Sequence, residues 1–245
     1  MDESERDDIR RAPWTVRDMV FGGLAGLGLF GLGLVLASVL VLLGQTVAPT
    51  LPSPAVLMPM VFALEAMLIL PAWWWGPRKY GGGWQSLGFR VPPALKTLAV
   101  FGVGLVVILL INVAWGAIQQ DLGLEGQPNV LPLFGEGIRG LLVALFLGGV
   151  VAPIAEEVFF RGFLYAGMRD RWGMIWGLVV SSVIFSVVHV VPGVLLPIAL
   201  IGVVLALAYE MTDSLWLPIA LHSALNSLAF IGTYIAQSNP ELLGG

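Results

Sequence analysis

Apolar runs of about 20 residues repeat along most of the 245-residue chain, separated by short charged or Pro- and Gly-rich segments. A helix needs a run of this length to cross the hydrocarbon core of a bilayer. Hydrophobic residues make up 58% of the sequence and charged residues only 11%, whereas about 25% of a soluble domain is charged. We therefore predict an all-α fold, a polytopic membrane helix bundle of about seven (six to eight) transmembrane helices.

The predicted spans divide the chain into four parts. We expect a charged cytoplasmic tail over 1–18, N-terminal transmembrane helices over 19–139, helices with the candidate catalytic residues over 140–236, and a C-terminal tail over 237–245. Within these parts the spans are expected at about 19–43, 55–75, 94–118, 141–168, 173–190, 194–209 and 215–235.

The positive charges predict the orientation of the chain. Lysine and arginine concentrate in the tail, the second loop and the fourth loop, whereas the first, third and fifth loops have none apart from Arg139 at the edge of a span. Because such residues accumulate on the cytoplasmic side, we predict a multi-pass protein of the cell membrane with a cytoplasmic N-terminus. No region is basic enough to indicate a nucleic-acid partner. With no cysteine in the sequence, disulfides, thiolate zinc sites and cysteine nucleophiles are excluded.

Ionisable side chains interrupt the span at 141–168. Glu156, Glu157 and Arg161 lie in its middle, where each charge costs about 2.5–3.5 kcal/mol, so a functional site is the default interpretation. Glu157 and Arg161 are four residues apart, acid before base, and should pair on one helix face. Glu156 is turned about 100° away and is predicted to face an intramembrane polar cavity. Glu65, in the second span, is expected to bond to a neighbouring helix rather than to shape this cavity.

The two histidines of the chain, His189 and His222, both fall within predicted spans. Phe185 precedes His189 by four residues, and Asn226 follows His222 by four, on the same helix face. Glu156 and His189 are equidistant from the turn around Trp172, so an antiparallel helix hairpin places them at one depth. The groups are therefore expected to converge on a single site.

Such a set of groups suits the hydrolysis of an acyl bond. Glu156 with His189 could polarise one water as a general base, while His222 and Asn226 could donate hydrogen bonds to an oxyanion. We expect the bond to be a peptide bond. Other peptidase sites lack their residues: all seven aspartates lie in the tail or loops, and the sequence contains neither H-E-x-x-H nor G-x-S.

Three motifs carry a family resemblance. Glu156-Glu157-x-x-x-Arg161, Phe185-x-x-x-His189 and His222-x-x-x-Asn226 resemble, in that order, the motifs of the CPBP family of CAAX proteases and bacteriocin-processing enzymes. The family includes the eukaryotic Rce1-type prenyl-protein endopeptidases and bacterial abortive-infection homologues. The resemblance covers about residues 140–235.

The resemblance implies an intramembrane endopeptidase that acts on a membrane-bound peptide or protein. It implies that Glu156 and His189 activate the water and that His222 and Asn226 stabilise the oxyanion. Three neighbours are expected to support them: Glu157, Arg161 and Phe185. A prenylated CAAX-type tail is the family's eukaryotic substrate.

Alternatives remain open for the metal and for the activity. Glu156, His189 and His222 could ligate a divalent metal such as zinc, but Glu156 would then lose its freedom as a base, and we favour water held without a tightly bound metal. A proton- or ion-coupled transporter could also place glutamate and histidine near the membrane midplane. A catalytically silent scaffold or immunity protein could keep the same fold for partner binding.

Overall fold

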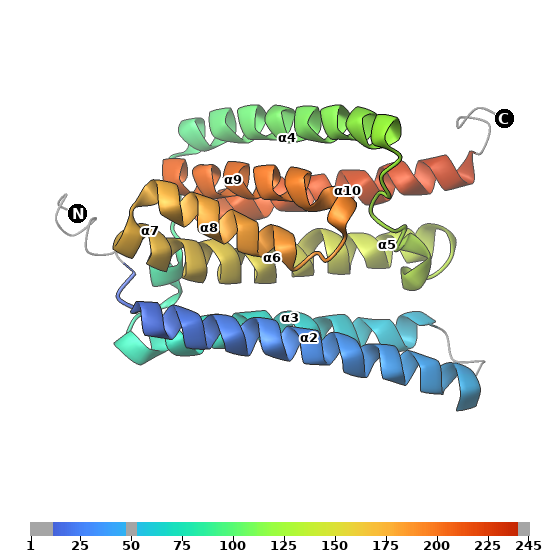
Figure 1. Ribbon diagram of the computed structural model, residues 1–245, viewed down its shortest axis with the longest axis horizontal. Coiled ribbons are helices and arrows are strands. Elements are labelled where there is room, and N and C mark those ends of the chain that lie inside the picture. Colours follow the sequence, from blue (N-terminus) through green and yellow to red (C-terminus); the bar gives the residue numbers. More distant parts are fainter. Residues whose placement is uncertain (1–11, 48–52, 240–245) are drawn as a thin grey trace.

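The computed structural model describes residues 12–47 and 53–239, and the regular structure in these two ranges is entirely helical. Its long helices lie side by side as seven rods (Figure 1). Six rods are single helices: α2 (Val16–Val47), α3 (Ser53–Trp75), α4 (Ala94–Leu122), α8 (Met174–Val187), α9 (Leu195–Thr212) and α10 (Trp216–Ser238). The seventh is a continuous run from Gly137 to Trp172, which we call the central rod. The predicted fold class is confirmed.

The helix lengths fit a membrane-spanning bundle. Within the described ranges, five helices are long and apolar enough to cross a bilayer. They cover Val16–Gly33, Ala94–Leu122, Gly137–Trp172, Pro192–Thr212 and Trp216–Ser238. Helix α8 is apolar but has only 14 residues, about 21 Å at 1.5 Å per residue, so it ends short of a full crossing.

Two π-helical segments interrupt the α-helix of the central rod. It consists of α5 (Gly137–Phe146), a π-helical turn η4 (Leu147–Val151), α6 (Ala152–Glu157), a second π-helical segment η5 (Val158–Tyr165) and α7 (Ala166–Trp172). Pro153 has no N–H to donate to the carbonyl one turn earlier, which is a physical reason for the widened turn before it. π-Helical turns are rare and are frequently found at functional sites.

The central rod lies between two layers of helices. Figure 1 shows α2 and α3 on one side of it and α8, α9 and α10 on the other, with α4 outermost against α9 and α10. Its aromatic side chains, among them Phe159 and Phe163, form the centre of the main hydrophobic core. A Cβ at Gly22 or Gly26 of α2 would overlap these two rings, so the glycines allow the close approach of α2. The division of the chain at residue 140 stays a prediction, since both parts pack together.

Short segments tie the rods together at the end where the chain begins. The 3₁₀ turns η1 (Pro77–Tyr80) and η2 (Trp84–Leu87) follow α3, and Lys79 forms an ion pair with Asp18 near the start of α2. The Asp18 carboxylate holds the pKa of the Lys79 amine above its usual value. Residues 1–11 of the predicted tail lie outside the described residues, and α2 already begins at Val16, before the expected start at residue 19. At the opposite end lie two more 3₁₀ turns, η3 (Leu131–Phe134) and η6 (Pro192–Val194).

Candidate active site

The predicted pair of Glu157 and Arg161 is present at the centre of the bundle. Arg161 Nη1 donates to Glu157 Oε1 at 2.8 Å, and the two side chains are 1% and 0% exposed. Arg161 Nη2 donates to the carbonyl of Gly202 on α9 at 3.0 Å. The guanidinium also lies over the ring of Phe185, 4.3 Å from its centroid. The arginine therefore links the central rod to α8 and α9 with its charge compensated.

His222 on α10 lies between the two glutamates. Its Nδ1 is 2.8 Å from Glu157 Oε1, and its Nε2 is 3.9 Å from Glu156 Oε2. An ionised carboxylate only accepts hydrogen bonds, so Nδ1 carries the proton when Glu157 is ionised beside Arg161. In the neutral ring, Nε2 then turns a lone pair toward Glu156. The sequence pattern missed the contact between Glu157 and His222, because no local spacing relates positions 65 residues apart.

Glu156 differs from its neighbour in both exposure and bonding. Its side chain is 21% exposed, against 0% for Glu157. The Oε2 atoms of both acids have no hydrogen-bond partner among the described residues, but Glu157 is bonded to Arg161 and His222 through its Oε1. The two adjacent acids are therefore in different states, one fixed by an arginine and an imidazole, the other free to take up a new partner.

Glu65 on α3 is a further acid near this site. It is 7% exposed, and its helix α3 packs against α6, which carries Glu156. We expected a hydrogen bond from Glu65 to a neighbouring helix, but its Oε2 has no such partner in the described part of the chain.

His189 lies beyond the end of α8 and not within a helix, which corrects the expected span to Val190. The helix ends at Val187, and Val190 adopts a left-handed backbone conformation with φ 52°. Val191 is held extended (φ −97°, ψ 106°) because it precedes Pro192, which disfavours helical geometry for the residue before it. No hydrogen bond or ion pair within the described residues joins His189 to Glu156; the imidazole nearest to Glu156 in these contacts is that of His222.

Phe185 connects the two histidines and the arginine. Its ring is buried, with centroid distances of 5.0 Å to His189 and 5.8 Å to His222 in edge-on contacts. Its backbone carbonyl is 2.8 Å from His189 Nδ1. The predicted supporting residue therefore positions His189 through both its ring and its carbonyl.

Asn226 lies one helical turn beyond His222 on α10. Its Nδ2 donates to the carbonyl of Gly148 in the π-helical turn η4 at 2.9 Å. An amide nitrogen has two hydrogens, so a second remains for another acceptor. Asn226 also lines a pocket of about 290 Å³, which we call the inner pocket. Its other lining residues are 127–131, Ala229, Phe230 and Thr233.

The residues predicted as metal ligands do not assemble as a metal site would require. Among the described residues, no three His, Cys, Asp or Glu side chains are grouped so that they could hold a metal ion. Of the set Glu156, His189 and His222, only the first and last lie within 4 Å of each other. These side chains do not fit a three-ligand zinc centre.

Comparison with known proteins gives one match. Residues 138–228 match the family model described as type II CAAX prenyl endopeptidase Rce1-like. No curated protein and no solved structure matches the chain. The matched segment contains all the candidate site residues on the central rod, on α8 and the turn after it, and on α10, from Glu156 to Asn226. Glu65 lies outside it.

Proposed function

We propose that this chain, which carries an Rce1-like CAAX endopeptidase domain at residues 138–228, hydrolyses a peptide bond of a membrane-associated substrate with a glutamate-activated water. The observation behind this proposal is the state of Glu156, whose Oε2 has no hydrogen-bond partner in the described part of the chain and lies 3.9 Å from His222 Nε2. That separation is too long for a direct hydrogen bond, and we place one water between the two groups in the reacting enzyme.

Glu156 acts as the base in the proposed reaction. It takes a proton from the water as the water oxygen attacks the carbonyl carbon of the scissile peptide. His222 holds the water through the lone pair on Nε2, and Glu157 keeps the imidazole in this orientation through Nδ1. The tetrahedral intermediate collapses when the protonated Glu156 passes its proton to the leaving amine, so the carboxylate is restored.

Asn226 is the proposed oxyanion donor. One of its Nδ2 hydrogens is bonded to the Gly148 carbonyl, which fixes the amide plane, and the other is available to the developing charge. His222 was expected to share this role, but the contact of its Nδ1 with Glu157 suits it better to orienting the water. His189, held by Phe185, is assigned to contact with the substrate.

We also propose that the N-terminus lies in the cytoplasm. Basic side chains join three segments at the same end of the bundle: the start of the described chain, η1 and α7. Lys79 of η1 pairs with Asp18, and Arg171 of α7 donates to the Trp14 carbonyl. The loop 123–136 at the other end contains acidic residues and no lysine or arginine. This asymmetry supports a multi-pass protein with its basic end inside.

The experiment compares wild type with Glu156→Ala in detergent on a prenylated or membrane-bound peptide. We expect cleavage by wild type and its loss in the variant. Asp121→Ala, which removes an exposed acid in the last turn of α4, is the matched control and should keep full turnover. Equal turnover by wild type and Glu156→Ala would remove this residue from the mechanism.

A further inference from the structure

The inner pocket begins one helical turn beyond His222, on the same face of α10. Asn226, Phe230 and Thr233 follow His222 at steps of four, four and three residues, so they form one stripe on the helix. His222 faces the glutamates, and the rest of the stripe lines the pocket. A group bound in the pocket is therefore adjacent to the proposed oxyanion donor.

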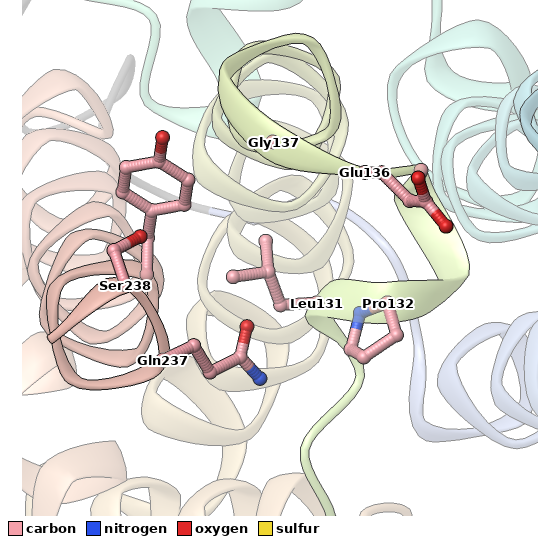
Figure 2. A pocket seen from close by; sticks show the side chains of 8 residues that line it. Leu131, Pro132, Glu136, Gly137, Gln237 and Ser238 are labelled. Carbon is pink, nitrogen blue, oxygen red and sulfur yellow. The ribbon is translucent and has the colours of Figure 1, made fainter. Parts of the chain in front are cut away.

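A second pocket extends this path to the end of α10. It has a volume of about 360 Å³, and we call it the outer pocket. Figure 2 shows Gln237 and Ser238 of α10 on one side of it, Glu136 and Gly137 on the other, and Leu131 between them. Leu131 lines both pockets, so the two are neighbours. The stretch of α10 from Asn226 to Ser238 spans about 18 Å, the length of five or six extended residues.

The loop before Leu131 bounds this path on the side of His189. Gln119 Nε2 donates to the carbonyl of Gly193, just after the His189 turn, and to the carbonyl of Glu125 in the loop. A Cβ at Gly193 would overlap the Glu125 carbonyl, so loop and turn are in close contact. The loop therefore runs from the His189 turn to the pocket that contains Asn226.

The chemistry of the lining suits an uncharged peptide. Among the described residues, the lining of the inner pocket includes the amides Gln127, Asn129 and Asn226, and no Lys, Arg, Asp or Glu. Amides both donate and accept, as a peptide backbone requires. The outer pocket adds the carboxylate of Glu136, and the described residues supply no cation to it. A C-terminal carboxylate would find no positive partner in either pocket and would meet a like charge in the second.

We propose that the inner and outer pockets together form a subsite for an uncharged internal stretch of the substrate polypeptide, and that this stretch reaches the glutamates from the end of the bundle that carries loop 123–136. The inference rests on the proposed peptidase function and adds the direction of approach and the class of peptide. It assigns the loop and the outer half of α10 to substrate selection.

Single cysteines test the subsite, because the natural chain has none. Ala229→Cys places a thiol in the inner pocket, and Leu228→Cys places one on the adjacent exposed position, which does not line it. Each variant is treated with thiol reagents of increasing size, and cleavage is compared with that of the same unmodified variant. We expect the largest reagent to lower cleavage by the Ala229→Cys variant at least about tenfold, a loss of about 1.4 kcal/mol. Cleavage by the Leu228→Cys variant should stay unchanged.

A second experiment uses three versions of one peptide that differ only at the C-terminus. They end in a free carboxylate, in a carboxamide, or in an extension of several uncharged residues. We expect the carboxamide and the extended peptide to be cleaved with a kcat/KM about tenfold above that of the free carboxylate. Full activity after modification at position 229, or a preference for the free carboxylate, overturns the subsite while loss of cleavage in Glu156→Ala still supports the protease. Absence of cleavage by wild type on all three peptides overturns the proposed function and the subsite with it.

Discussion

Nδ1 of His222 lies 2.8 Å from Oε1 of Glu157, the same oxygen that accepts a hydrogen bond from Arg161. One buried carboxylate thus joins the central rod to an imidazole of α10. Removing the acid would leave a buried guanidinium without its counter-ion and free the imidazole to rotate. The neighbouring Glu156 has no comparable role in holding helices together.

The two adjacent glutamates should therefore differ in their effect on stability. Glu157→Gln is expected to lower the free energy of unfolding by about 3–5 kcal/mol, because it leaves the charge of Arg161 buried and uncompensated. Glu156→Gln should change it by less than about 1 kcal/mol, as for a residue without such partners. Thermal melting in detergent measures both, and similar melting temperatures for the two variants would contradict the division of roles.

Asn226→Ala tests the oxyanion donor. Loss of one such donor is expected to lower kcat about 10²- to 10³-fold with little change in KM, because the interaction forms only in the transition state. Asn112→Ala is the matched control, since the Asn112 amide bonds to the Ile108 carbonyl of its own helix α4. A rise in KM with unchanged kcat in Asn226→Ala would instead assign this residue to ground-state binding.

Val190 stores backbone strain next to His189. A β-branched residue with φ 52° carries a cost of about 1–2 kcal/mol that glycine does not. Val190→Gly should therefore raise the free energy of unfolding by about 0.5–1 kcal/mol after the entropy of the unfolded chain is subtracted. Peptide cleavage should fall as His189 becomes less restrained. Val183→Gly, inside α8, should destabilise by about 1 kcal/mol, and a destabilised Val190→Gly would show that the turn is not strained.

Metal analysis tests the water-only site. His222 already uses Nδ1 toward Glu157, and Glu156, His189 and His222 are not grouped as zinc ligands. We therefore expect purified protein to contain no stoichiometric metal and to keep its activity after prolonged chelation. Stoichiometric zinc whose removal abolishes cleavage would contradict the proposed mechanism and assign Glu156 as a ligand.

The orientation can be measured on intact cells with single cysteines. Glu125→Cys lies in the acidic loop, and Gln85→Cys lies in the turn η2 at the basic end; both positions are exposed. A membrane-impermeant maleimide should label position 125 in intact cells and position 85 only after lysis. The reverse pattern would place the N-terminus and the basic loops outside.

Periodicity and composition were enough to predict the features that depend on residues close together in the sequence. Apolar runs of membrane-crossing length determined an all-helical bundle, because a backbone in lipid must satisfy its own hydrogen bonds. The pair of Glu157 and Arg161 followed from a spacing of four residues on one helix. The end of α8 was misplaced by a few residues, although Pro192 marked the break, because the left-handed turn at Val190 is not encoded in a periodic pattern.

The candidate site required the tertiary structure. The sequence by itself determined which ionisable groups are forced into the membrane, since their cost there demands a partner or a cavity. Packing decided which groups meet: α10 brings His222 to both glutamates, α3 brings Glu65 toward Glu156, and the His189 ring rests on Phe185. Contacts between helices depend on rotation and tilt set by the whole core, which no spacing within one segment specifies.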